Sequence, residues 1–312
     1  MRKTEVKALK NKLSLDYDSK CVFVGSCFSE NIAERMRNCG FNVVNNPLGV
    51  LFNPISVAHV LTNPSEILKE SSFLQKDNIH LNWHANSKVY GANGLESFQE
   101  EVTKLLEDFN QNLASADVLF ITFGSSFVYK YKATQTRVAN CHKVVQSEFE
   151  KELLTVDEML VVWRRVLAVL KEQNPRLRIV FTVSPVRHIK DGLIENNRSK
   201  ARLFELVTAL EHEDCTYFPA YELVMDECRD YAYFEADGVH PNAFAVQRVW
   251  EYFFETYFSK DTQKTMQQYL SFKHFFAHKA LHPESDEHIS IVQKQEGKFK
   301  DFLENHPNIK HQ

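Results

Sequence analysis

Short apolar runs alternate with helical patterns along most of this chain, and this alternation restricts the fold more than any other feature. Five runs have the length and composition of buried strands, and they span residues 21–25, 41–44, 117–124, 178–185 and 215–218. Most of the segments between them carry apolar residues at the spacing of amphipathic helices. Strands that alternate with helices form parallel sheets covered on both faces. The sequence therefore predicts an α/β fold built on one parallel sheet.

Local signals mark the ends of several helices. Gly40 follows a helical pattern over residues 26–39 and is typical of the residue after a helix. Thr155, with Glu158 three residues later, predicts a capping box at the start of a long helix. A helix predicted over residues 241–258 has a proline near its start, where the missing N–H costs little.

Two regions depart from the alternation. Residues 63–95 are polar and irregular, and we interpret them as an insertion near the functional site. Residues 259–312 predict a helical extension that packs on the same domain and is divided at His282-Pro283. The main domain accordingly spans residues 1–258.

Composition excludes several classes of function. The net charge of the 312-residue chain is −4 and no basic block occurs, so the electrostatic signature of nucleic-acid binding is missing. No apolar run approaches the roughly 20 residues that span a membrane. The first 15 residues lack the apolar core of a secretory signal. The six cysteines have no zinc-like spacing, and we expect reduced thiols in a cytoplasmic protein.

The segment "GSCFS" (25–29) places two possible nucleophiles, Ser26 and Cys27, where a strand turns into a helix. The free N–H groups of a helix N-terminus favour developing negative charge there. Ser26 is either a helix cap, which is a common role of serine, or a nucleophile. Cys27 is either a buried thiol or the nucleophile. Adjacent residues at a helix start point about 100° apart, so one histidine does not easily serve both.

The segment "DGVHPN" (237–242) supplies a base and a group to orient it. Asp237 and His240 are three residues apart before a predicted helix, so the carboxylate can reach the imidazole Nδ1–H. That contact fixes the tautomer and leaves Nε2 free to accept a proton. The alternative is a turn with a capping aspartate and an incidental histidine.

Two glycine-containing loops follow the second and third predicted strands. Gly49 in "NPLGVLFNP" can present its N–H to an oxyanion. Gly124 in "FGSSF" permits close backbone approach, and Ser125 or Ser126 offers a hydroxyl. Both loops are also compatible with simple turns.

The order of "GSCFS", "NPLG", "FGSS" and "DGVHP" resembles the GSCFA family within the SGNH/GDSL superfamily of esterases and acyltransferases. Further blocks resemble that family in its own order over about residues 15–258: "VANCHK", "FTVSPVRHIKDG", "NRSKA" and "YFPAYELVMDECRDY".

The resemblance implies a three-layer α/β/α sandwich whose five parallel strands have the order 2-1-3-4-5. It implies Ser26 as nucleophile, His240 as base and Asp237 as the orienting carboxylate. The implied oxyanion donors are the N–H groups of Ser26 and Gly49 and a third side chain. The superfamily has asparagine at the third position, where this chain has Ser126; either Ser126 or Asn140 would take that role.

Other polar residues are candidates for substrate binding. Arg187 and His188 follow the fourth strand, where Arg187 either pairs with a substrate carboxylate or braces the site. His142 is either structural or substrate-binding. Trp83 and His84 lie in the insertion, where the indole would stack on a sugar ring or anchor a loop. No HxH or HExxH pattern supports a metal site, and we expect no cofactor.

These observations predict a serine-dependent ester hydrolase or O-acyltransferase that acts on a small acyl ester, for which a carbohydrate ester is the class suggested by the resemblance. The alternative is a non-catalytic module with the same scaffold that binds a glycan or peptide. The set of Ser26, Asp237 and His240 argues against that alternative, because binding does not need all three.

Overall fold

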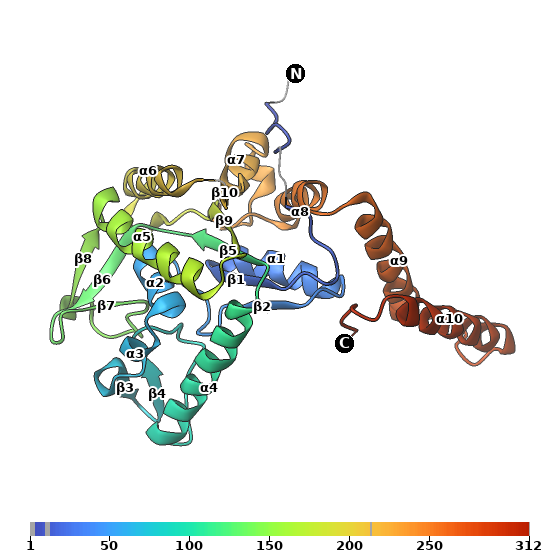
Figure 1. Cartoon of the computed structure of the whole chain (residues 1–312), viewed down its shortest axis with the longest axis horizontal. Coiled ribbons are helices and arrows are strands. Elements are labelled where there is room, and N and C mark those ends of the chain that lie inside the picture. Colours follow the sequence, from blue (N-terminus) through green and yellow to red (C-terminus); the bar gives the residue numbers. More distant parts are fainter. Residues whose placement is uncertain (1–3, 10–12, 213, 312) are drawn as a thin grey trace.

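The computed structural model of the chain describes residues 4–9, 13–212 and 214–311. Its centre is a five-stranded, all-parallel sheet in the order β10-β9-β5-β1-β2 (Figure 1). Counted along the chain, this is the predicted order 2-1-3-4-5, so the predicted fold is confirmed. The strands are β1 (Cys21–Gly25), β2 (Val43–Asn45), β5 (Val118–Phe123), β9 (Arg178–Val183) and β10 (Cys215–Tyr217).

Helices cover both faces of this sheet, as expected for strands that are apolar on both sides. One face packs against α1 (Cys27–Asn38) and α8 (Ala243–Tyr257), and Phe23 and Phe120 of the sheet lie in that core. The other face packs against the helices α2 (Pro54–Thr62), α4 (Leu95–Ala114), α5 (Val156–Gln173) and α6 (Leu193–Leu210). The sheet is therefore the middle layer of an α/β/α sandwich.

The predicted helix signals are present, with small shifts. The capping box of Thr155 and Glu158 begins α5, and Gly40 follows α1 with φ +87°. Helix α8 begins two residues later than predicted, because the Asn242 side chain caps it and Pro241 precedes the cap. The domain also contains two short α-helices, α3 (Pro64–Ile67) and α7 (Ala220–Glu222). Further short helical turns lie at Glu70–Ser72, Gln146–Glu148, Ile189–Asp191, Leu223–Glu227 and Tyr231–Tyr233.

Gly25 makes the close contact between β1 and β5 possible. Its φ is +131°, and a Cβ at this position would lie 2.1 Å from the Thr122 carbonyl oxygen. Glycine is thus required where the chain leaves β1 and enters α1. Glycine at this position therefore allows the tight turn between β1 and α1.

The prediction of an irregular insertion over residues 63–95 is wrong in part. The segment holds α3 and an antiparallel hairpin of β3 (Phe73–Lys76) and β4 (Ile79–Asn82). Its last part supports a loop of the main domain, since Asn86 donates its backbone N–H to Leu48 and its side-chain N–H to Val50. The end of the insertion therefore stabilises the loop that follows β2.

A second sheet, which the sequence analysis did not predict, lies at the edge of the domain. It consists of β6 (Phe127–Tyr131), β7 (Thr136–Val138) and β8 (Phe149–Leu153), all antiparallel in the order β7-β6-β8. Its strands are only half-buried, and several positions on them are charged. This sheet connects β5 to α5.

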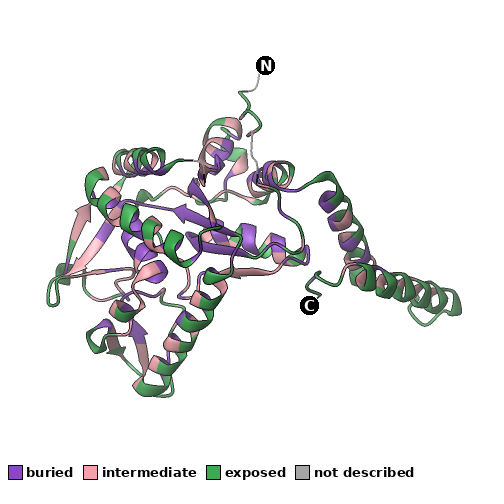
Figure 2. Ribbon diagram, in the orientation of Figure 1, coloured by how far each residue is buried: buried purple, intermediate pink, exposed green. Residues whose placement is uncertain are grey.

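The C-terminal extension consists of α9 (Lys260–Ala277) and α10 (Asp286–Asn305), which project from the sandwich (Figure 1). The first half of α9 contacts the main domain through Met266, and the chain end returns to it, where the Lys310 N–H donates to the Gly40 carbonyl. The tip of this hairpin is largely exposed (Figure 2). In the described part of the chain, no helix has the length and apolarity needed to cross a membrane.

Candidate active site

Three neighbouring strands end side by side at the carboxyl end of the sheet. β1 ends at Gly25, β5 at Phe123 and β9 at Val183, and the pairing registers place these ends side by side. The carboxyl edge of a parallel sheet is where α/β proteins form their sites. The segments "GSCFS", "FGSSF" and "SPVRH", which follow these strands, therefore begin side by side at the carboxyl end of the sheet.

Asp237 and His240 form a hydrogen-bonded pair in the loop before α8. The Oδ2 atom of Asp237 lies 2.7 Å from Nδ1 of His240. Its Oδ1 atom accepts the backbone N–H groups of Val239 and His240 at 2.8 and 3.0 Å. These hydrogen bonds, with the imidazole contact first, hold the pKa of Asp237 at about 2. The carboxylate is therefore ionised and leaves Nε2 of the imidazole free for chemistry.

Arg187 braces this loop from the neighbouring strand end. Its guanidinium donates to the Gly238 carbonyl at 2.8 Å. The guanidinium carbon also lies 4.3 Å from the centre of the Phe234 ring and 5.4 Å from that of Tyr231. Of the two predicted roles of Arg187, the structure shows the bracing contact.

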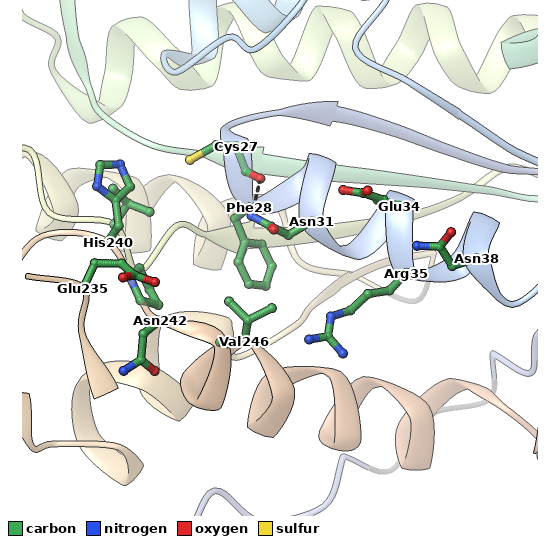
Figure 3. Close-up of a pocket in the computed structure, with 13 residues that line it drawn as sticks. Cys27, Phe28, Asn31, Glu34, Arg35, Asn38, Glu235, His240, Asn242 and Val246 are labelled. Atoms are coloured by element: carbon green, nitrogen blue, oxygen red, sulfur yellow. Dashed lines mark hydrogen bonds between the residues drawn. The ribbon is translucent and has the colours of Figure 1, made fainter. Parts of the chain in front are cut away.

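An open cavity of about 690 Å³ lies between α1 and the start of α8 (Figure 3). Cys27 and Phe28 line it from α1, His240 and Asn242 from the other side, and Val186 from the loop after β9. His240 retains 53% side-chain exposure, so its ring is open to a ligand in the cavity. The cavity thus joins the predicted base to the start of α1.

One face of α1 forms a polar wall of this cavity that the sequence analysis missed. Asn31, Glu34, Arg35 and Asn38 line it together with Cys27. Their helical spacing puts them on one face. That spacing is the signal that could have found them, but the same pattern is typical of any solvent-exposed helix face.

Ser26 and Cys27 have different environments. Ser26 is 1% exposed, and its Oγ accepts the Phe28 N–H at 3.3 Å as the cap of α1. Its own N–H donates to the Thr122 carbonyl at 3.1 Å. Cys27 is half-buried and lines the cavity, and Figure 3 shows its sulfur directed to the side on which His240 lies. The structure therefore brings Cys27, but not Ser26, into the cavity wall with His240.

The other predicted oxyanion donors make internal hydrogen bonds. The Gly49 N–H donates to Asn46 at 2.8 Å, and the Ser126 hydroxyl donates to the Ser199 carbonyl at 3.1 Å. The Asn140 Oδ1 accepts the His142 N–H at 2.7 Å. None of the three lines the cavity that His240 shares with α1. Their oxyanion role stays a prediction.

Lys200, which the sequence analysis did not single out, lies buried beneath the rim. Its ammonium donates to the carbonyls of Gly124 and Ser184 at 2.7 and 2.6 Å, and so connects the ends of β5 and β9. Burial lowers the pKa of Lys200 to about 7, and the nearby Cys27 opposes that change. A lysine in "NRSKA" at helical spacing from apolar residues gave no sign that it would be fully enclosed.

Two of the histidines predicted to bind substrate, His188 and His142, lie outside the cavity wall. The His188 imidazole is exposed, and its Nε2 is 3.8 Å from Asp191. His142 is buried, and its Nε2 is 2.8 Å from the Asn82 carbonyl. Burial lowers the pKa of His142, and the buried part of the His188 ring lowers the pKa of His188 in the same direction. The structure favours the structural alternative for His142.

Trp83 and His84 are enclosed within the domain. Trp83 is 4% exposed and packs on Tyr131 and Phe149, so it has no free face on which a sugar could stack. The Nδ1 of His84 lies 3.3 Å from that of His59. Burial, followed by the effect of His59, lowers the pKa of His84 to about 4. Both residues therefore serve packing in this arrangement, and the expected stacking on a sugar is not supported.

Potential metal ligands are dispersed over the described part of the chain. Within residues 4–9, 13–212 and 214–311, no three His, Cys, Asp or Glu side chains lie close enough together to hold a metal ion.

The solved structures to which this chain shows a weak similarity include three esterases. A carbohydrate esterase family 3 from Talaromyces cellulolyticus is 8% identical, with a TM-score of 0.34 over 81% of this chain and 99% of that one. A mutant acetyl esterase with acetate ion is 8% identical, with a TM-score of 0.35 over the same shares. An acetyl xylan esterase, Est2A, from Butyrivibrio proteoclasticus is 12% identical, with a TM-score of 0.37 over 77% of this chain and 63% of that one. Such weak likeness carries no function to this chain.

No curated protein matches the sequence. The model of the GSCFA family matches residues 20–253, well over half of the chain and the whole of the parallel sheet. The chain therefore belongs to the GSCFA family.

Proposed function

We propose that this protein is an ester hydrolase or O-acyltransferase of the SGNH type that works through an acyl-enzyme. The observation that carries the proposal is the 2.7 Å contact between Asp237 and His240, with the imidazole lining the same cavity as the start of α1. An aspartate that fixes a histidine tautomer beside a nucleophile is the arrangement of acyl-transfer enzymes. Two residues at the start of α1 carry a nucleophilic atom, namely Ser26, which the sequence predicts, and Cys27.

The cavity wall supports an ester of a polyhydroxylated alcohol as substrate. Asn31 and Arg35 offer hydrogen-bond donors, and Glu34 and Glu235 offer acceptors. Hydroxyl groups both donate and accept, so a sugar ring can satisfy such a mixed set. Water and a second hydroxyl compete for the acyl-enzyme at the same position, so hydrolysis and transfer use the same residues.

The free thiols of all six cysteines support a cytoplasmic location.

Release of acetate from acetylated oligosaccharides and from 4-nitrophenyl acetate tests the proposal. We expect turnover by the wild-type protein and a loss of roughly a hundredfold or more in His240→Ala. The matched control is His212→Ala, an exposed histidine beside the amino end of β10, at the opposite edge of the sheet. It should keep wild-type activity. Adding an acceptor alcohol separates transfer from hydrolysis.

The second candidate, a binding module without turnover, is favoured by the internal hydrogen bonds of the predicted oxyanion donors. A folded wild-type protein that binds oligosaccharides but releases no acetate would support that candidate and contradict the enzyme. Equal turnover by wild-type and His240→Ala proteins would also contradict the proposed enzyme.

A further inference from the structure

The Ser26 hydroxyl makes a hydrogen bond within the turn between β1 and α1. Its Oγ accepts the Phe28 N–H, its N–H donates to Thr122, and its carbonyl accepts the Ser29 N–H at 2.8 Å. With 1% of the residue exposed, no substrate carbonyl can approach its Oγ without rearrangement of that turn. The cap satisfies a helix N–H that would otherwise be unpaired.

Cys27 has the access that Ser26 lacks. It is the first residue of α1, it lines the cavity that His240 also lines, and its sulfur is directed toward the side of that histidine (Figure 3). Among the other five cysteines, Cys141 is half-buried and the rest are buried, and none of the five lines this cavity.

The surroundings of the Cys27 thiol keep it protonated at rest. Burial, followed by the Glu30 carboxylate, raises the pKa of the thiol. The backbone N–H groups of Cys27 and Phe28 at the N-terminus of α1, and then Lys200, lower the pKa by less. The resting group is therefore a neutral thiol, which needs a base, rather than a preformed thiolate.

We infer that Cys27, rather than Ser26, is the nucleophile of the proposed acyl transfer, and that Ser26 is the cap that sets its position. This inference rests on the proposed function, which supplies the acyl-transfer reaction. The cavity shared by Cys27 and His240 supplies the geometry. His240 Nε2 accepts the thiol proton while Sγ bonds to the ester carbonyl carbon. The C–O bond to the alcohol then breaks, the alkoxide takes the proton from His240, and a thioester remains on Cys27.

The second half of the reaction returns the thiol. Water or an acceptor alcohol gives its proton to His240 and attacks the thioester carbonyl. The C–S bond breaks, the acyl group leaves as acid or new ester, and the thiolate of Cys27 recovers the proton. A thiolate leaves more readily than an alkoxide because thiols are far more acidic than alcohols, so a thioester suits transfer to a hydroxyl group.

Separate substitutions of Ser26 and Cys27 distinguish the nucleophile from the helix cap. Cys27→Ala should lower kcat by roughly three orders of magnitude or more, since the nucleophile is removed. Cys27→Ser, which keeps a nucleophilic atom in place, should retain measurable activity above that of Cys27→Ala. Ser26→Ala should lower kcat less than about tenfold while it lowers Tm through loss of the cap. The reverse order, with Ser26→Ala inactive but folded and Cys27→Ala active, would overturn the inference.

Alkylation by iodoacetamide tests the Cys27–His240 relation without any ester substrate, so its failure is distinguishable from failure of the proposed function. Peptide mapping by mass spectrometry measures the rate at each cysteine, with the half-buried Cys141 as internal control. We expect a Cys27 rate that rises with deprotonation of His240 and falls at least severalfold in His240→Ala, with no change at Cys141. An unchanged Cys27 rate in His240→Ala would overturn the assignment of His240 as its base.

Discussion

The Oδ2 atom of Asp237 lies 2.7 Å from Nδ1 of His240, three residues later in the loop that leads into α8. The backbone N–H groups of Val239 and His240 hold the other carboxylate oxygen. One short loop therefore fixes the carboxylate, the ring and the tautomer together. His240 also lines the cavity that α1 borders.

Replacement of the carboxylate by an amide should disturb the tautomer and leave the loop in place. We expect Asp237→Asn to lower kcat roughly a hundredfold to ten-thousandfold with little change in Tm. The control is Asp191→Asn, since Asp191 faces His188 at the same sequence spacing but at 3.8 Å. Its effect on kcat should stay below about tenfold. Equal effects of the two substitutions on kcat would contradict a catalytic role of Asp237.

Arg187 should act on the reaction through the loop that carries His240. Arg187→Met removes the hydrogen bond to the Gly238 carbonyl and the contact with Phe234. We expect kcat to fall roughly ten- to hundredfold because the base loses its position, while KM changes little, and Arg187→Lys to recover part of the loss. A rise in KM with kcat unchanged would instead assign Arg187 to substrate binding.

Lys200 should stabilise the rim of the sheet. In Lys200→Met the buried carbonyls of Gly124 and Ser184 lose their hydrogen-bond donor, which should lower the free energy of unfolding by about 2 kcal/mol. The control is Lys171→Met, because Lys171 is exposed and its ion pair with Asp214 should contribute less than about 1 kcal/mol. Denaturant unfolding measures both. A Lys200→Met protein as stable as the wild type would contradict the structural role of this lysine.

The buried His84 should make the protein less stable in mild acid. Unfolded His84 binds a proton near pH 6.5, but in the folded protein burial lowers its pKa to about 4. Between these values the unfolded state holds more protons, so the free energy of unfolding falls as the pH falls, by up to about 3 kcal/mol.

Urea unfolding at several pH values checks this in the wild type and in His84→Gln. The decline between pH 6.5 and 4 should be smaller in this variant than in the wild type, whereas His278→Gln, at an exposed histidine, should keep the wild-type decline. An identical decline in wild type and His84→Gln would show that other groups cause it.

The parallel sheet was predictable because its strands are buried on both faces and appear as continuous apolar runs. The sheet of β6, β7 and β8 was not, since its strands are half-buried and carry charges at several positions. The hairpin of β3 and β4 was missed for the same reason. Strand and loop are hard to distinguish where little apolar area is buried.

In the site, contacts between residues close in the sequence were predictable, and contacts between distant segments were not. The contact of Asp237 with His240 spans three residues, so spacing was enough to predict it. The choice between Ser26 and Cys27 depends on which way each side chain leaves a turn, and that is set by packing of the turn against Thr122 of β5. Enclosure of Lys200 likewise depends on strands about 16 and 76 residues away in the chain.

Trapping of the acyl-enzyme tests the central claim most directly. The wild-type protein is mixed with 4-nitrophenyl acetate, quenched with acid within the first turnover, and digested for mass spectrometry. The account predicts one acetyl group on the peptide that contains Cys27, attached as a hydroxylamine-labile thioester, and its loss in His240→Ala. An acetyl group on Ser26, or turnover by the wild type with no acetyl group on Cys27, would contradict it.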